Sequence, residues 1–303
     1  MYDVVIIWAW SAGLPAWMYA SRYKLKNIVI WAQPGWALAT SHKVENWPGE
    51  LSATGKKIMD DFQKHAETSG SEILQEFVTK VEKIDSGFVV ETSSGKVFET
   101  HYVILATGNK YRHLWAKWEE EFLWKWVSYC ATCDWMFFKD REVAIVGWGN
   151  TALTEALYLA DICKKVYLIH RKDTFRAETV RVDLVKQKEN IELVLNQEVE
   201  EIRGSMFMEE IELKSGMTIK ADGIFVAIGS DPDTKLIDHM HPQKDIDGCL
   251  IVDNRQHTSV IGLYAAWDVT TNSNKFKQTI MSAAEGCLAA NSVHEDHLLS
   301  QQP

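Results

Sequence analysis

The chain contains one pair of cysteines whose spacing suits redox chemistry. Cys130 and Cys133 lie in the run Tyr129-Cys130-Ala131-Thr132-Cys133-Asp134, a Cys-x-x-Cys followed directly by an aspartate. The same spacing also occurs in zinc sites, but a structural zinc ion needs four ligands. The sequence has no second Cys-x-x-Cys and no His-x-x-x-His, so we predict a redox-active dithiol and no metal site.

Composition narrows the class of protein. A length of 303 residues is enough for about two domains. The 32 Lys and Arg residues against 42 Asp and Glu give a net charge of −10, which opposes binding to nucleic acid or anionic lipid. No apolar run approaches the roughly 18 to 20 residues of a membrane span, and no targeting leader precedes the first predicted strand. We therefore expect a cytoplasmic protein with neither nucleic acid nor membrane as a partner.

A first nucleotide-binding corner is predicted at the N-terminus. The apolar run Val4–Ile7 is typical of a buried parallel strand, and residues 12–23 have helical spacing. Strand, tight turn and helix in this order bind a dinucleotide through the N-terminus of the helix. A Gly-x-Gly-x-x-Gly turn needs its first two glycines for a tight backbone and a close ligand. Here the turn reads Trp8-Ala9-Trp10-Ser11-Ala12-Gly13, which keeps the last glycine alone.

The same pattern recurs in the middle of the chain. The predicted strand Glu142–Val146 leads into the turn Gly147-Trp148-Gly149-Asn150-Thr151-Ala152, and a helix is predicted over residues 152–160. The turn keeps two of its glycines. We predict a second dinucleotide site at this corner.

The segment after the next predicted strand, Lys165–Ile169, favours NADPH over NADH. An acidic side chain at this distance from the turn would bind a ribose 2′-hydroxyl, whereas several cations suit a 2′-phosphate. The segment 170–176 reads His-Arg-Lys-Asp-Thr-Phe-Arg. Lys172 keeps the charge of an arginine but not its bidentate fork. The alternative is a solvated basic loop without a ligand.

Three further strands end in turns that suit a flavoprotein. Residues 102–108 and 223–229 each form a predicted strand that ends in glycine, which alone is weak evidence. The strand 262–268 ends at Asp268 and precedes a predicted helix over residues 278–294. The Asp268 carboxylate could bind a polyhydroxylated chain, or it could cap the following turn.

Together these motifs resemble the low-molecular-weight thioredoxin reductases, of the class II pyridine nucleotide-disulfide oxidoreductases. The matching segments are 44–49, Thr107-Gly108, 127–134, 170–178 and 264–269. The resemblance implies an α/β fold with two three-layer Rossmann-like domains, FAD-binding over 1–112 and 243–303 and NADPH-binding over 113–242. It also implies a homodimer, with thioredoxin or a thioredoxin-like disulfide protein as the partner.

The resemblance also assigns roles to single residues. Cys133 would lie nearer the flavin, Cys130 would attack the partner disulfide, and Asp134 would exchange the proton. Electrons would pass from NADPH to FAD, to the Cys130–Cys133 disulfide and then to thioredoxin. Residues 111–114 and 240–244 are candidate hinges between the domains. The predicted cofactor-binding residues are Trp8, Ser11, Ala12, Gly13, Gly35, Trp36, Leu38, Asn46, Thr107, Gly108, Asp268, Lys277, Gln278, Gly147, Gly149, Asn150, Thr151, His170, Arg171, Lys172 and Arg176.

The tryptophans depart from the family pattern. Trp47 fits it, but the other twelve stand where the family shows glycine or, at Trp17, a small residue. They are Trp8, Trp10, Trp17, Trp31, Trp36, Trp115, Trp118, Trp124, Trp126, Trp135, Trp148 and Trp267. One hypothesis is that these codons are UGA, read as glycine by the source cell and written as tryptophan. The alternative is a genuine tryptophan-bearing chain that binds nucleotides poorly and serves as a binding module. A relative that reduces another disulfide partner also stays open.

Overall fold

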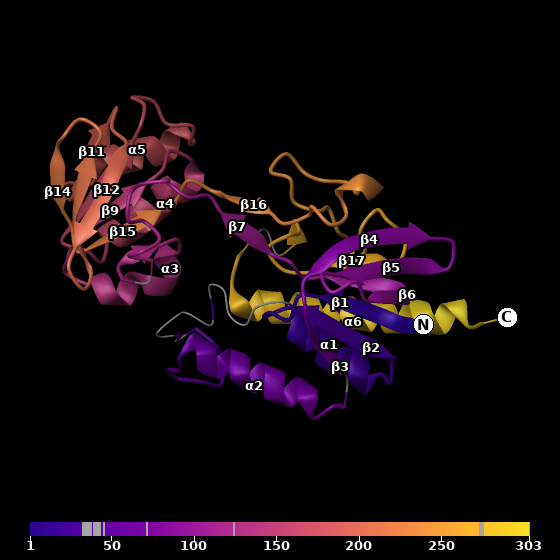
Figure 1. Ribbon diagram of the computed structural model, residues 1–303. Helices are drawn as coiled ribbons and strands as arrows, with labels where there is room; N and C mark the ends of the chain where they lie inside the picture. The colour runs from indigo at the N-terminus through magenta and orange to yellow at the C-terminus, as the bar shows by residue number, and fades with distance from the viewer. Residues whose placement is uncertain are drawn as a thin grey trace. The chain divides into compact units, whose positions relative to one another are not determined.

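The computed structural model describes residues 1–31, 38, 44, 46–70, 72–123, 125–272 and 276–302 and divides the chain into two compact units (Figure 1). The first unit comprises Met1–Lys110 and Asp231–Pro303, and the second comprises Tyr111–Ser230. The second unit is therefore inserted into the sequence of the first. The two crossings of the chain pair with each other as the short strands β7 (Asn109–Tyr111) and β16 (Ser230–Pro232).

The division at Ser230 differs from the expected boundary after residue 242. Residues 231–242 belong to the first unit because Ile237 is fully buried in its core, where Leu236 and Met240 pack beside it. The second crossing lies about ten residues before the candidate hinge at 240–244, which stays a prediction. The first crossing falls at Tyr111, within the expected segment 111–114.

The sheet of the first unit has seven strands in the order β3-β2-β1-β6-β5-β4, with β17 also paired to β6. Strands β1, β2, β3, β6 and β17 run parallel, and β4 and β5 form an antiparallel extension. All five residues of β2 and the last four of β1 are buried, which agrees with their continuous apolar sequence. The strands are β1 (Tyr2–Ile7), β2 (Asn27–Trp31), β3 (Glu72–Gln75), β4 (Val78–Ile84), β5 (Gly87–Thr92), β6 (Val97–Leu105) and β17 (Leu263–Ala265).

Three helices belong to this unit: α1 (Gly13–Arg22), α2 (Gly55–Glu67) and α6 (Thr279–Ser300). Helices α1 and α6 pack together, and their small residues allow the close approach. Helix α2 begins at the N-cap Thr54, whose side chain accepts a hydrogen bond from the Lys57 backbone amide at 3.1 Å. The sequence placed α1 and the start of α6 within a residue, but α6 continues six residues beyond its predicted end.

The second unit has three layers. Its central sheet is parallel, in the order β11-β10-β9-β15-β8, and the antiparallel strands β12, β13 and β14 form a second sheet. One core packs α4 and α5 on the central sheet, and another lies between the two sheets. The elements are β8 (Val127–Ser128), α3 (Ala131–Asp134), a 3-10 helix (Trp135–Phe138), β9 (Glu142–Val146), α4 (Asn150–Ala160), β10 (Lys165–His170), α5 (Thr179–Gln187), β11 (Ile191–Leu195), β12 (Val199–Gly204), β13 (Met208–Leu213), β14 (Thr218–Lys220) and β15 (Gly223–Val226).

These findings confirm the expected α/β class. Both units place a helix directly after a buried parallel strand, which is the order that the sequence predicts for each corner. Within the described ranges, no helix is both long enough and apolar enough to cross a membrane.

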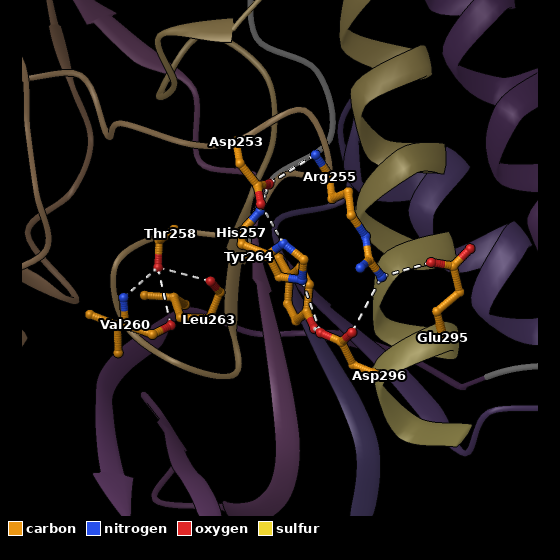
Figure 2. Close-up of polar contacts among 9 residues, drawn as sticks. All are labelled: Asp253, Arg255, His257, Thr258, Val260, Leu263, Tyr264, Glu295 and Asp296. Carbon is orange, nitrogen blue, oxygen red and sulfur yellow. Dashed lines mark hydrogen bonds and ion pairs between the residues drawn. The ribbon is translucent and has the colours of Figure 1, made fainter. Parts of the chain in front are cut away.

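A polar network ties α6 to the loop before β17 (Figure 2). His257 lies between two carboxylates, 2.8 Å from Asp253 through Nδ1 and 2.9 Å from Asp296 through Nε2. The Tyr264 hydroxyl donates to Asp296, and Arg255 pairs with Asp296 at 3.3 Å. Burial alone would raise the pKa of Asp296, but the hydrogen bonds from Tyr264 and His257 and the Arg255 charge outweigh it and lower that pKa.

This network predicts a loss of stability in acid. Because the folded-state pKa of Asp296 is lowered, its contribution is complete above the ordinary value of 3.8 and disappears as the pH falls through the folded value. Asp296→Asn should lower the free energy of unfolding by about 1–3 kcal/mol at pH 7, since Tyr264 and His257 lose a charged acceptor. The difference from the unmutated chain should shrink below pH 3.8. Urea titrations at several pH values measure it.

The neighbouring variant Glu295→Gln is the matched control. Glu295 lies next to Asp296 on α6, and its half-exposed carboxylate also pairs with Arg255, which Glu295→Gln abolishes. Its effect should stay below about 1 kcal/mol because exposed ion pairs contribute little. An Asp296→Asn deficit that is the same at every pH would contradict the electrostatic account.

Candidate functional site

The two cysteines of the Cys-x-x-Cys form a disulfide at the carboxyl end of β8. Cys130 is the N-cap of α3, and Cys133 lies within that helix, so their Cα atoms are 5.3 Å apart. The Cys133 amide donates to the Cys130 carbonyl at 3.1 Å, which closes the turn. Both residues are half-buried. The predicted pairing is thus confirmed, and the site lies at the edge of the sheet where parallel α/β folds bind ligands.

Ser128 connects the disulfide loop to Asp134. Its hydroxyl donates to the Asp134 carboxylate at 2.6 Å and accepts the backbone amide of Cys130 at 3.1 Å. Ser128 is 3% exposed, so the hydrogen bonds form in a site with little competing water. The carboxylate is thereby held one residue from Cys133. Ser128 was not among the predicted site residues, although a hydroxyl residue at a strand end, two positions before a cysteine, is a usable signal.

A second acidic residue lies beside the same loop. Burial raises the pKa of Glu155 to about 7, and a hydrogen bond from the Ala131 backbone amide opposes the shift. Glu155 is on α4 and contacts the residue that follows Cys130. Glu155 was not among the predicted site residues. It could have been recognised as the one acid among the apolar residues Leu153, Ala156 and Leu159, which are buried in the structure.

The backbone of the first corner has the shape that a dinucleotide needs. Helix α1 begins at Gly13, directly after the turn that follows β1. A Cβ atom on Gly13 would lie 1.8 Å from the Trp8 carbonyl oxygen, so glycine is required there. Ser11 and Ala12 are buried, and the Ser11 and Ser282 hydroxyls are 2.7 Å apart. The turn is therefore held by α6 as well as by α1.

Most other residues predicted to contact FAD lie around this corner. Thr107 and Gly108 follow β6, and the Thr107 hydroxyl donates to the Asp233 carbonyl at 2.6 Å. The Asn46 amide donates to the Gln278 side chain at 2.9 Å, which joins two distant predicted residues. Leu38 packs against core residues of the same unit. Gly35 and Trp36 lie outside the described residues.

Asp268 lies in a pocket beside the N-terminus of α6. The pocket is lined by Lys277, Gln278 and Glu285 among others. Burial raises the pKa of Asp268 to about 6; Lys277 lowers it, and the charge of Glu285 raises it further. Glu285 is 4% exposed and accepts the Trp267 backbone amide at 2.7 Å, which fixes the turn that carries Asp268. Glu285 was not predicted, although an acid next to a glycine inside an apolar helix marks it.

The second corner also needs glycine for its backbone. A Cβ atom on Gly147 would lie 2.5 Å from the Ala227 carbonyl oxygen, whereas one on Gly149 would meet nothing within 4 Å. Asn150 begins α4 and accepts the Glu178 backbone amide at 2.8 Å, and Thr151 is exposed. These four residues follow one another at the carboxyl end of β9, and their role in binding a nucleotide stays a prediction.

The basic segment after β10 has two different parts. Arg171, Lys172 and Arg176 are exposed, which suits contact with a phosphate. His170 is 2% exposed, with its ring between those of Trp148 and Phe175. Burial lowers the pKa of His170, and the nearby Arg171 and Lys172 charges lower it further against a hydrogen bond to Thr174. The neutral, buried ring supports the loop rather than presenting a charge.

Indole side chains stand at the turns of both corners. The rings of Trp8 and Trp10 are stacked with centroids 6.0 Å apart, and Trp267 adds a third indole 6.4 Å from Trp10. A Cβ on Gly108 would lie 2.4 Å from the Trp267 ring. In the second corner, the Trp148 ring lies 5.1 Å from the Arg171 guanidinium. Trp8, Trp10 and Trp148 stand within the two turns, at positions where a dinucleotide-binding corner needs little or no side chain.

The tryptophans also strain the backbone. Trp8, Trp115, Trp118, Trp126 and Trp267 have φ between 60° and 82°, in the left-handed region that favours glycine. A side chain in this region costs about 1–2 kcal/mol per residue. Five such residues cost about 5–10 kcal/mol, which is comparable with a typical folding stability of about 5–15 kcal/mol.

A Cys-x-x-Cys disulfide in a chain whose two α/β units each have a dinucleotide-type corner defines a nucleotide-dependent dithiol oxidoreductase. The family model "Pyridine nucleotide-disulphide oxidoreductase" matches residues 2–286, and the chain belongs to this family. Two curated relatives cover nearly the whole chain. The chain is 38% identical to the glucosaminate ammonia-lyase of Pseudomonas fluorescens, over 95% of this chain and 93% of that protein. It is 36% identical to the thioredoxin reductase of Helicobacter pylori strain J99, over 97% and 98%.

Solved structures agree with this assignment. The thioredoxin reductase of Streptococcus pyogenes MGAS5005 superimposes with a TM-score of 0.91 at 30% identity, and the alignment covers 99% of both chains. That of Giardia duodenalis gives a TM-score of 0.89 at 31% identity, again over 99% of both. The relatedness therefore extends through both units of the chain.

The close packing at the first corner yields a stability prediction. A Cβ on Gly286 of α6 would lie 2.0 Å from the Ala12 carbonyl oxygen, so Gly286→Ala forces α6 away from the turn. We expect a loss of about 1–3 kcal/mol from overpacking, although alanine favours a helix by roughly 1 kcal/mol. Thermal unfolding followed by circular dichroism measures it. Leu288→Ala, at an exposed position of the same helix, should change stability by less than about 0.5 kcal/mol. An equal or smaller effect of Gly286→Ala would refute the close contact.

Proposed function

We propose that the protein is an NADPH-dependent thioredoxin-disulfide reductase. The observation that carries the proposal is the half-buried Cys130–Cys133 disulfide at the end of β8, with the Asp134 carboxylate held beside it by Ser128. Membership of the family and similarity to thioredoxin reductases over nearly the whole chain support it. A cytoplasmic location and a homodimeric state belong to the same proposal; a net charge of −10 favours an aqueous compartment.

The disulfide and its neighbours account for the exchange with thioredoxin. In the reduced state, the Cys130 thiolate attacks one sulfur of the partner disulfide. A bond forms between Cys130 and that sulfur, and the other partner sulfur leaves as a thiolate that takes a proton. The Cys133 thiolate then attacks Cys130, which restores the Cys130–Cys133 bond and releases the second partner thiol. Two electrons and two protons have then passed to the partner.

Asp134 has the position for moving these protons. Its carboxylate is fixed next to Cys133 by the Ser128 hydroxyl, so it can take the proton from one thiol and return it to a leaving thiolate. Ser128 also binds the Cys130 amide, and the same hydroxyl therefore positions both the acid-base group and the attacking cysteine. Ser128 acts as a positioning residue.

FAD and NADPH, the cofactors of this family, supply the hydride chemistry that reduces the disulfide again. The residues that would hold the NADPH 2′-phosphate are Arg171, Lys172 and Arg176, three exposed cations in the loop after β10. Asp268, Asn46 and Gln278 would hold the polar chain of FAD in the first unit. The FAD-binding role of the first unit and the NADPH-binding role of the second are part of this proposal.

The exchange step can be tested without either cofactor. The Cys130–Cys133 pair is reduced chemically, the reductant is removed, and an equal amount of oxidised thioredoxin is added. Thioredoxin thiols should appear in proportion to the protein. Cys133→Ser should stop at a mixed disulfide through Cys130, whereas Cys130→Ser should give none. Gel electrophoresis without reductant and intact mass show the adduct.

The buried cysteine Cys163 provides the matched control, since Cys163→Ser removes a free thiol of the same unit that is not part of the Cys-x-x-Cys. This variant should reduce thioredoxin fully. Full exchange by either Cys130→Ser or Cys133→Ser would rule out the proposed relay. Glucosaminate is tested in parallel because of the ammonia-lyase relative; loss of ammonia without thioredoxin reduction would replace the proposal.

The hydrogen bond from Ser128 predicts a change in pH dependence. Ser128→Ala removes a donor to the ionised Asp134, so the acidic limb of the rate of thioredoxin reduction should move to higher pH. At neutral pH the rate should fall by about ten- to a hundredfold, as expected when a hydrogen bond to a charged group worth about 1.5–3 kcal/mol is lost. Ser128→Thr keeps the hydroxyl and should restore the profile. A slower rate with an unshifted profile would show that Ser128 is merely structural.

A further inference from the structure

We infer that the natural protein has glycine, not tryptophan, at twelve of its thirteen tryptophan positions, because the source cell reads the codon UGA as glycine. The inference concerns every tryptophan except Trp47. It does not depend on the function proposed above, since its main support is the conformation of the backbone.

The backbone angles single out these positions. Among the described residues, ten that are not glycine have φ in the left-handed region, and five of the ten are tryptophans. Nine glycines share this region. Trp is a bulky residue that rarely adopts such angles, whereas glycine adopts them freely. The five are Trp8 (78°), Trp115 (60°), Trp118 (68°), Trp126 (82°) and Trp267 (79°).

The other described tryptophans of the set give a second kind of support. Trp10 and Trp148 occupy glycine positions of the two phosphate-binding turns. Trp17 is fully buried, Trp31 is 5% exposed, and the indole nitrogen of each is buried without a hydrogen-bond partner. Nothing in the structure marks Trp135, which is included by the sequence pattern alone. Trp36 and Trp124 lie outside the described residues.

Trp47 behaves as an ordinary tryptophan. It is half-buried, and its ring meets the Phe62 ring edge to face with centroids 5.1 Å apart. It packs on a small core around Val44, Ala53 and Ile58. Its φ is not in the left-handed region. The chain therefore contains an internal reference for what a true tryptophan site looks like.

A reassigned codon explains why tryptophan, and no other residue type, stands at these glycine positions. UGA differs from the glycine codon GGA by one base, and some genetic codes read it as tryptophan and others as glycine. When UGA is translated as tryptophan instead of glycine, the change affects every UGA codon, whatever the structure around that residue. It therefore places indoles even in tight turns, from which natural selection would exclude a large side chain. Glycine at these positions turns the first corner into Gly-Ala-Gly-Ser-Ala-Gly and the second into Gly-Gly-Gly-Asn-Thr-Ala. Both then leave the phosphate space open.

The codons and the mass of the natural protein test the inference directly. Trp47 should be encoded by UGG and the other twelve positions by UGA. Protein isolated from its source cell should be lighter than the written sequence by twelve indolylmethyl groups, and peptide sequencing should find glycine at each position. UGG at the twelve positions, or tryptophan in the peptides, would overturn the inference.

A pair of expressed chains tests its physical consequence. The chain with glycine at the twelve positions should be soluble and should unfold at a higher temperature than the chain as written. Replacement of Trp8 alone by glycine should raise the midpoint by roughly 2–8 °C, as expected when one left-handed side chain that costs about 1–2 kcal/mol is removed from a unit of this size. A glycine chain that is no more stable than the written one would contradict the inference.

Trp47→Gly in the glycine chain is the matched control, because it makes the same replacement where the indole packs on Phe62. It should lower the midpoint. Flavin absorbance separates this inference from the proposed function: the glycine chain should purify yellow with stoichiometric FAD, and the written chain should be colourless or insoluble. A stable but colourless glycine chain would uphold the inference and refute the flavoenzyme proposal. A written chain that is equally yellow would refute the steric argument.

Discussion

The close approach of backbone to backbone at the strand-to-helix corners is the constraint on which the rest of the structure depends. At Gly13, Gly147 and Gly286 an added Cβ would lie between 1.8 and 2.5 Å from a carbonyl oxygen, so no side chain fits there. This approach places the N-termini of α1 and α4 at the ends of β1 and β9, with their backbone amides facing the space for an anion. It also allows α6 to support the first corner through Ala12.

The segment around the dithiol is also short and closely packed. The disulfide follows a strand of two residues and is closed by the four-residue helix α3, so two of the polar groups beside it come from the same short segment. Ser128 and Asp134 come from that segment. Glu155 comes from α4, which the sheet brings alongside. A titratable group with a pKa of about 7 next to Ala131 gives the loop a second carboxyl group that changes charge near neutral pH.

The tryptophan side chains stand at the corners, where the close approach of the backbone leaves the least room for a side chain. Trp8, Trp10 and Trp267 gather in front of the first corner, and Trp148 covers a cation of the second. The exchange chemistry of Cys130 and Cys133 needs none of that space. Reduction of the pair by nucleotide cofactors requires it, since the phosphates must approach the backbone directly. Glycine at these positions makes the two halves of the proposed activity compatible.

The sequence by itself determined the class of fold, both corners, the order of their elements and the reactive pair, because local periodicity and spacing specify these features. It also marked the twelve tryptophans as a set. The tertiary structure decided what depends on distant contacts. It assigned residues 231–242 to the first unit through the burial of Ile237, and it placed the His170 ring in the interior. It joined Asn46 to Gln278 across the unit and brought Glu285 to the turn at Asp268. Burial and hydrogen bonding between segments far apart in the chain are not specified by local periodicity or spacing, so the partners of these residues emerged only after folding.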